Sequence, residues 1–405
     1  MLRHGGLGLR SVAIIGAGFC GTMTAIHLLR AGGTSVTLFE RSGSFGPGLA
    51  YSTRCAAHLL NVPAGRMSAL PDVPDDFLRW GLAQGHHWAG GTFAARREYG
   101  KYLQDALNAA EALGKGTLER VTGEVVACRP HTAGVEVAWR RGGVDGPATT
   151  RVFTSAVLAL GNFPPPHVHP GLAGLSAGLY AADPWAAGAL EGLDPTGPVL
   201  LIGTGLTMLD VVLSLVERGH RGTMHALSRR GLLPQPHRSA GKPPASHAPP
   251  KGWETWDPSA QAMLRNVRRE VARAAKRGVD WREVITSLRS ITPQLWQRLP
   301  ERERGAFLRH LRPYWEVVRH RSAPSVDGQM QELMMSGRLH VHAARLASVA
   351  AVDGGGGVDV RIVSRGGQVE RSLRVARLIS CTGPETDCRR LACPLVRQLL
   401  AEGLG

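Results

Sequence analysis

A glycine-rich turn after a short β-branched run near the amino end constrains the fold most strongly. Residues 11–15 read Ser-Val-Ala-Ile-Ile and lead into Gly16-Ala-Gly18-Phe-Cys-Gly21, after which residues 22–30 have apolar positions at helical spacing. In such a turn Gly16 permits the tight bend, Gly18 lets a pyrophosphate approach the backbone, and Gly21 lets the helix pack on the strand. The pattern predicts a strand, a phosphate-binding turn and a helix.

An acidic residue follows the second predicted strand, at a position where it could bind a ribose. Residues 35–39 form a second β-branched run that ends in Glu40, 24 residues after Gly16, and Arg41 follows. A carboxylate at this distance binds ribose hydroxyls. We therefore take Glu40 and Arg41 as cofactor-binding candidates; the alternative is a glycine-rich loop in another kind of α/β protein.

The same pattern recurs in the second half of the chain. Residues 198–202 enter Gly203-Thr-Gly205-Leu-Thr-Met208, followed by a helical run at residues 209–217 and a strand at residues 223–227. Methionine takes the place of the third glycine. A second dinucleotide-binding unit is predicted, with Gly203 and Gly205 at the phosphates.

The second unit differs at the end of its second strand. Ser228-Arg229-Arg230 stands where the first unit has Glu40. Arginine pairs with the 2′-phosphate of NADP, and the missing acid removes repulsion against it. The sequence thus predicts NADPH in the second unit, unless Arg229 and Arg230 are merely solvated surface residues.

Each unit continues into a predicted β-meander that ends at a glycine. The strands are expected at residues 124–127, 135–139 and 150–160, with turns at 132–134 and 142–143, and again at residues 346–352, 358–363 and 373–380. The expected fold class is α/β, with two Rossmann-like dinucleotide-binding domains of the two-nucleotide flavoprotein type. The expected domains are residues 10–165 for FAD, 195–385 for NAD(P)H with an insertion at about 235–335, and 386–405 as a short return.

The insertion begins with residues 234–253, rich in Pro, His and Ser, which we expect to form a loop or lid. Helical spacing follows at residues 259–278, 281–290 and 301–318. One stripe of the first helix carries four arginines: Arg265, Arg268, Arg269 and Arg273. It is either a solvated helix face or a cover over an anionic substrate.

Composition excludes several classes of protein. The 405 residues are 43% hydrophobic and 20% charged, so they can bury a large core, and the formal net charge of +16 favours anionic partners. Aromatic residues make up 5% of the chain and do not alternate with basic ones, which argues against nucleic acid binding. The longest apolar run is interrupted by glycines and polar residues, so we expect no membrane span.

Cysteine and histidine usage suggests neither a redox disulfide nor a metal site. None of the six cysteines forms a CxxC pair, and the histidine pairs lack a second ligand pair. We expect a cytoplasmic protein that acts on a small molecule without a metal. The sequence does not indicate its oligomeric state.

Several segments resemble the bacterial FAD/NAD(P)-binding proteins that include the FAD-dependent urate hydroxylase and the aspartate-oxidising, nitrosuccinate-forming monooxygenase. They are residues 46–53 (GPGLAYST), 58–68 (HLLNVPAGRMS), 97–103 (REYGKYL), 203–208, 228–234 (SRRGLLP) and 381–385 (CTGPE). The resemblance implies that residues 46–68 line the isoalloxazine side of FAD, with Asn61, Arg66 and Ser68 as candidate contacts. A structural role for that loop is the alternative.

The resemblance also implies an activity. NADPH would reduce the flavin, and reduced flavin would react with dioxygen to a C4a-hydroperoxide that hydroxylates an amine or an electron-rich carbon. No FxGxxxHxxxW pattern follows Leu160, which disfavours a Baeyer-Villiger enzyme. The family continues beyond the point where this sequence stops, so an incomplete FAD site is expected. A reductase without oxygen insertion, or a nucleotide-binding protein with impaired catalysis, remains an alternative.

Overall fold

The chain builds two units and returns to the first. A computed structural model describes residues 10–141, 146–238, 247–354, 356–367 and 370–404. Unit 1 consists of Met1–Pro166 and Gly383–Gly405, and unit 2 of His167–Thr382. The outgoing and returning segments pair within unit 1 through an antiparallel bridge between Phe163 and Glu385. No helix in the described part of the chain is long and apolar enough to cross a membrane.

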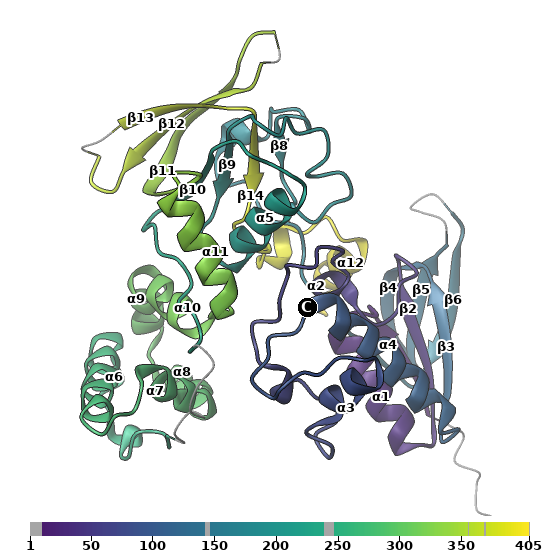
Figure 1. The fold of residues 1–405 in the computed structure, drawn as a ribbon. Helices are drawn as coiled ribbons and strands as arrows, with labels where there is room; N and C mark the ends of the chain where they lie inside the picture. The colour runs from purple at the N-terminus through teal and green to yellow at the C-terminus, as the bar shows by residue number, and fades with distance from the viewer. Residues whose placement is uncertain (1–9, 142–145, 239–246, 355, 368–369, 405) are drawn as a thin grey trace, which may run out of the picture. The chain divides into compact units, whose positions relative to one another are not determined.

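Unit 1 is built on a parallel sheet in the order β3-β2-β1-β7 (Figure 1). Its strands are β1 (Arg10–Ile15), β2 (Thr34–Glu40), β3 (Thr117–Thr122) and β7 (Ser155–Leu158). The helices are α1 (Phe19–Ala31), α2 (Gly48–Tyr51), η1 (Ala64–Arg66), α3 (Asp76–Ala83) and α4 (Arg96–Ala112). Ile26 and Leu29 of α1 are buried with Leu107 of α4, so the two longest helices share one apolar core with the sheet.

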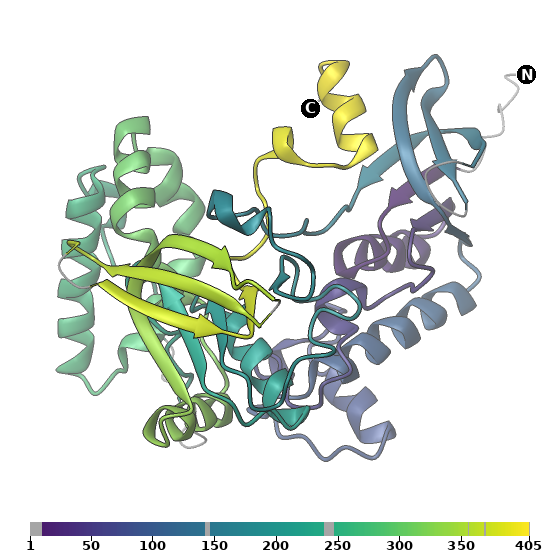
Figure 2. The same ribbon diagram turned by 90° about the horizontal axis from the view of Figure 1, so that it is seen from above.

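A second, antiparallel sheet completes unit 1. It contains β4 (Glu124–His131), β5 (Gly134–Arg140) and β6 (Ala148–Phe153). The returning segment forms η5 (Cys388–Arg390) and α12 (Pro394–Ala401), and α12 packs against β4 (Figure 2). Leu395 of α12 is fully buried in the cluster that holds Phe39 and Trp139.

Unit 2 contains one sheet in the order β13-β12-β11-β10-β9-β14-β8. Its strands are β8 (Tyr180–Ala181), β9 (Val199–Ile202), β10 (Met224–Ser228), β11 (Leu339–Ala351), β12 (Val358–Ser364), β13 (Glu370–Val375) and β14 (Arg377–Ser380). The pairs from β8 to β11 are parallel, and β11, β12 and β13 form an antiparallel meander. η2 (Pro170–Leu172) precedes β8, and α5 (Leu206–Glu217) joins β9 to β10.

A helical insertion separates β10 from β11. Its elements are η3 (Trp253–Thr255), α6 (Ala260–Ala275), α7 (Trp281–Ser287), η4 (Leu288–Ser290), α8 (Thr292–Arg298), α9 (Glu301–His310), α10 (Arg312–Arg319) and α11 (Pro324–Met335). Helices α6 to α10 gather in one green group in Figure 1. All four arginines of the predicted stripe on α6 are exposed, as on a solvated helix face.

Some predicted elements are wrong in their extent, and β11, expected at residues 346–352, already begins at Leu339. The third strand of each meander is two strands, because the chain leaves the antiparallel sheet of unit 1 at Thr154, and the antiparallel part of the unit 2 sheet at Ala376, and then joins parallel strands. The helix expected at residues 301–318 breaks at Leu311, because Pro313 cannot continue the hydrogen bonds of α9. The predicted turn at 142–143 and part of the predicted loop at 234–253 lie outside the described residues.

Candidate functional site

The glycine turn of unit 1 is shaped by close backbone contacts. Gly16 has a φ of 101°, and a Cβ there would overlap with the carbonyl group of Ala159. A Cβ at Gly21 would overlap with the carbonyl oxygen of Gly16. By contrast, a Cβ at Gly18 would meet only Gly48 Cα, at an ordinary 3.6 Å. Gly16 and Gly21 are therefore required by the fold, whereas Gly18 leaves open space at the amino end of α1.

Glu40 ties the end of β2 to the glycine turn. Its Oε2 accepts a hydrogen bond from the backbone N–H of Ala17 at 3.0 Å, and its Oε1 accepts from the backbone N–H of Ser42 at 2.9 Å. Oε1 also accepts from the Ser42 hydroxyl at 2.8 Å, whereas Oε2 can accept a further hydrogen bond. The carboxylate is thus held in position while retaining acceptor capacity for a ribose. Arg41 is exposed beside it.

The glycine turn of unit 2 repeats this construction. Gly203 has a φ of 119°, and a Cβ there would overlap with the carbonyl group of Cys381, which follows β14 as Ala159 follows β7. Nothing lies within 4 Å of a Cβ at Gly205. Met208 is fully buried in place of the third glycine. The open space again lies at the second glycine and the amino end of the helix.

Ser228 replaces Glu40 in this second construction. The hydroxyl of Thr204, inside the glycine turn, donates to the Leu232 carbonyl at 2.6 Å and lies 2.8 Å from the Ser228 hydroxyl. Ser228 Oγ also accepts from the backbone N–H of Gly231 at 3.0 Å. A neutral hydroxyl therefore makes the link that a carboxylate makes in unit 1, and no negative charge stands at the end of β10.

The two arginines after Ser228 have different surroundings. Arg230 donates to the Tyr314 hydroxyl of α10 at 2.9 Å, and its guanidinium lies 4.8 Å from the centre of the Tyr314 ring. Arg229 is exposed, and within the described ranges its side chain has no recorded ion pair or hydrogen bond. The structure thus gives Arg230 a partner in the insertion and leaves Arg229 available to an anion.

The loop between α2 and α3 is held against the start of α4. The backbone N–H of Leu60 donates to the Ala94 carbonyl at 2.8 Å, and Arg96 Nε donates to the Leu59 carbonyl at 2.9 Å. His58 is buried, with its Nδ1 2.8 Å from the Thr53 hydroxyl. These contacts fix the loop without any ligand.

The three candidates on this loop differ in their availability. The Ser68 hydroxyl donates to the carbonyls of Leu70 and Val73 and accepts from the Leu70 N–H, so its bonding capacity is used within the loop. Asn61 is half-buried, and Arg66 is exposed. The geometry therefore supports the structural alternative for Ser68 and leaves Arg66 accessible.

Aromatic residues of α3 and α4 pack against this loop. Tyr102 of α4 accepts from the Ala69 N–H at 2.8 Å and donates to Asp76 at 2.6 Å. Burial raises the pKa of Tyr102, and the hydrogen bond to Asp76 raises it further, so the hydroxyl stays protonated as a donor. Phe77 and Tyr99 pack beside it, with ring centres 5.0 Å apart. Sequence reasoning missed this support; the aromatic spacing in residues 97–103 was its only signal.

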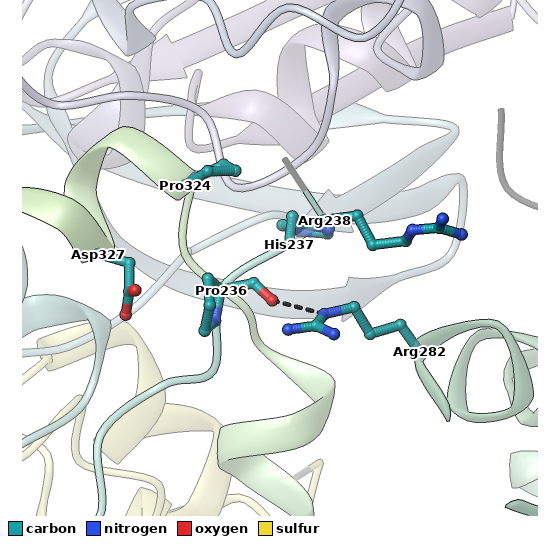
Figure 3. Close-up of a pocket in the computed structure, with 6 residues that line it drawn as sticks. All are labelled: Pro236, His237, Arg238, Arg282, Pro324 and Asp327. Atoms are coloured by element: carbon teal, nitrogen blue, oxygen red, sulfur yellow. Dashed lines mark hydrogen bonds between the residues drawn. The ribbon is translucent and has the colours of Figure 1, made fainter. Parts of the chain in front are cut away.

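Unit 2 contains a polar pocket of about 330 Å³ lined by Pro236, His237, Arg238, Arg282, Pro324 and Asp327. Figure 3 shows Arg238 and Arg282 on one side of Pro236 and Asp327 on the other. Arg282 Nε donates to the Pro236 carbonyl at 2.8 Å, which holds that guanidinium in place. This pocket was not predicted from sequence, and Arg282 in its wall already pairs with Asp280 at 3.3 Å.

The thiol and metal-ligand chemistry of the described residues is limited. All six cysteines are free thiols, and burial raises the pKa of Cys128 to about 11. No group of three or more His, Cys, Asp or Glu residues in the described ranges could hold a metal ion.

Residues 13–163 match the model of a family described as FAD-NAD(P)-binding. No curated protein matches the chain. The fold is similar to that of the FAD-bound cadaverine monooxygenase of the desferrioxamine pathway from Erwinia amylovora, with a TM-score of 0.62, 12% identity, and coverage of 96% of this chain and 81% of that one.

Two ornithine-hydroxylating enzymes also share the fold. The reduced ornithine hydroxylase from Pseudomonas aeruginosa has a TM-score of 0.58 and 16% identity, with 97% of this chain and 86% of that one covered. The ornithine N-hydroxylase from Kutzneria sp. 744, with reduced FAD, NADP⁺ and L-ornithine, has a TM-score of 0.55 and 16% identity, with 92% and 80% covered. The predicted two-nucleotide flavoprotein fold is confirmed, and so is an FAD-NAD(P)-binding domain in unit 1.

Proposed function

We propose that the protein is an FAD-dependent, NADPH-consuming monooxygenase that hydroxylates a small polar substrate at nitrogen or at an electron-rich carbon. The observation that carries this proposal concerns the two glycine turns. They are built alike, but the strands that follow them lead to residues of opposite charge. Glu40 stands at the end of β2, whereas Ser228 and Arg229 stand at the end of β10. One unit therefore suits an unphosphorylated ribose, and the other a 2′-phosphate.

The residues of unit 1 fit FAD. The open side of Gly18 and the free N–H groups at the start of α1 suit a pyrophosphate, since a helix amino end carries unpaired donors and a partial positive charge. Glu40 suits the ribose hydroxyls, and the fixed loop at residues 58–68 offers Arg66 and Asn61 to the ring system. Bound FAD would accept a hydride and pass electrons to dioxygen.

The residues of unit 2 fit NADPH in a corresponding way. Gly205 leaves room for the phosphates, and Arg229 would pair with the 2′-phosphate. Arg230, held by Tyr314, would add positive potential without moving. A neutral Ser228 avoids repulsion of that phosphate.

The polar pocket suggests the chemistry of the substrate. Arg238 suits a carboxylate, because Arg282 is already paired with Asp280, and Asp327 suits an ammonium group. The fold relatives named above act on ornithine or cadaverine, which supports an amine. Oxidation at nitrogen would convert R–NH₂, O₂, NADPH and H⁺ into R–NHOH, NADP⁺ and water. Hydroxylation of an electron-rich carbon in a urate-like anion is the second candidate, which rests on the resemblance to the family that includes the urate hydroxylase.

The test is a balance of reactants and products. Purified holoprotein is supplied with NADPH, oxygen and single candidates: ornithine, lysine, cadaverine, aspartate and urate. A monooxygenase consumes one NADPH and one O₂ per hydroxylated product. Equal NADPH consumption and hydrogen peroxide release with every candidate, and no hydroxylated product, would instead support the reductase alternative. Arg238→Gln should raise the KM for a carboxylate-bearing substrate and not for cadaverine.

A further inference from the structure

The helical insertion encloses an apolar cavity that none of the chemistry proposed above uses. Its volume is about 490 Å³, within the range of ordinary ligand pockets. The walls come from α6, α7, α8, α9 and α10 and include four tryptophans, Trp256, Trp281, Trp296 and Trp315. The cavity is distinct from the polar pocket, with which it shares no lining residue.

The apolar side chains around this cavity are not packed as a closed core. Ile285, Leu288 and Ile291 form a buried cluster in the insertion, and cavity-lining side chains such as Trp281 and Trp315 pack against it while staying partly exposed. Helices α8, α9 and α10 contain no buried residue, although each carries large apolar side chains. In a well-packed helical bundle, the apolar stripe of each helix is buried, and the packing density is close to that of organic crystals. The apolar stripes of α8, α9 and α10 instead stay partly exposed around the cavity, as they would around a bound ligand.

The cavity has one charged wall residue. Arg268 of α6 lies among the apolar lining and is exposed, and no ion pair joins it to an acid in the described ranges. The Thr292 hydroxyl donates to the Leu288 carbonyl and the Tyr314 hydroxyl accepts from Arg230, so the other polar groups of the wall are the neutral indole N–H groups of the tryptophans. No acidic side chain among the described lining residues offers an ion pair to a cation.

We propose that the cavity binds a carboxylic acid with an unbranched apolar tail. The tail lies among the tryptophans and the aliphatic residues of α6, α7 and α8. The carboxylate pairs with Arg268. Among the described residues that line the cavity, Arg268 alone is charged, which argues for a ligand whose one charged group is an acid. This inference goes beyond the proposed redox function.

The test uses the tryptophans as probes. Hexanoate, octanoate and decanoate are titrated below their micelle concentrations into the holoprotein while tryptophan fluorescence is recorded. Each added methylene should raise the affinity about threefold to fourfold, because its burial is worth a constant free energy. Decanol should bind roughly tenfold more weakly than decanoate, because it lacks the charge that pairs with Arg268. Affinity that does not depend on chain length would overturn the proposal.

Variants separate the cavity from the protein surface. Arg268→Gln should weaken decanoate binding roughly tenfold, whereas Arg265→Gln, on the same exposed face but outside the cavity, should leave it unchanged. Val271→Phe should fill the space and abolish both the fluorescence change and the rise in Tm that decanoate causes in the wild type. Equal loss in the two arginine variants would show nonspecific attraction to a basic helix.

Two other results would also overturn the proposal. One is a dimer in analytical ultracentrifugation together with no change in tryptophan fluorescence when the acids are added. A second copy of the chain would then cover the cavity. The other is an affinity for decylamine equal to that for decanoate. Because no readout requires turnover or a flavin signal, failure here leaves the proposed monooxygenase untouched, and loss of the redox activity leaves this binding intact.

Discussion

Gly18 and Gly21 stand three residues apart in one turn, yet substituting them should have different consequences. Gly21→Ala should destabilise unit 1, because its Cβ would overlap with the Gly16 carbonyl oxygen. Gly18→Ala should fold normally, because its Cβ would lie 3.6 Å from Gly48 Cα. Its methyl group would instead occupy the space of a pyrophosphate, so FAD should be lost. Thermal unfolding with flavin content measures both; full flavin retention in a folded Gly18→Ala variant would contradict the FAD assignment.

Arg229 and Arg230 offer a second matched pair. Arg229→Ala should reduce the preference for NADPH over NADH roughly tenfold or more, because a charge-assisted hydrogen bond to phosphate is lost. Arg230→Ala should change that preference less and should loosen the contact with Tyr314. Flavin reduction rates with the two nucleotides decide between them. Equal rates in the wild type would refute the NADPH assignment.

At the scale of elements, α12 is an integral part of unit 1. Gln398 and the backbone of Cys128 exchange two hydrogen bonds, and Leu395 is fully buried. Leu395→Ala should lower the free energy of unfolding by about 2–5 kcal/mol, the range for a large aliphatic side chain removed from a core. Leu400→Ala, on the same helix but 38% exposed, should cost less than about 0.5 kcal/mol. Urea unfolding of both variants tests this, and equal stabilities would show that α12 is only loosely attached.

The elements that the sequence predicted well have local signals. Both glycine turns, their flanking strands and the helices α1 and α5 follow from β-branched runs and glycine spacing, which depend on a few adjacent residues. The break of the third meander strand at Thr154 did not follow, because it depends on the hydrogen bond from Thr154 N–H to the Ser11 carbonyl, a residue far away in sequence. Helix α8 was missed because its seven residues start with Thr-Pro and give little periodicity.

Among the candidate site residues, sequence spacing indicated Gly16, Gly18, Glu40 and Arg229. In the structure these residues lie at the two glycine turns or at the ends of the strands that follow them, with geometry that is compatible with the proposed cofactors. It could not distinguish Ser68, whose hydroxyl is used within its own loop, from Arg66, which is exposed. That difference depends on three-dimensional partners. The polar pocket and the apolar cavity were beyond prediction for the same reason, because their walls depend on how the loop and helices of the insertion pack together.

At the scale of the whole molecule, the formal net charge of +16 should affect the encounter with NADPH. A positive field attracts a nucleotide with several phosphates, and salt screens it over about 30 Å at 0.01 M but only about 10 Å at 0.1 M. We therefore expect kcat/KM for NADPH to fall several-fold between these ionic strengths, whereas kcat at saturating NADPH stays nearly constant, because steering changes the encounter and not the bound complex. Stopped-flow reduction across a sodium chloride series measures both quantities. If the field acts broadly, Arg229→Ala will keep most of the salt dependence while losing its nucleotide preference. A variant that loses both together would show that one arginine, and not the whole charge distribution, attracts the nucleotide.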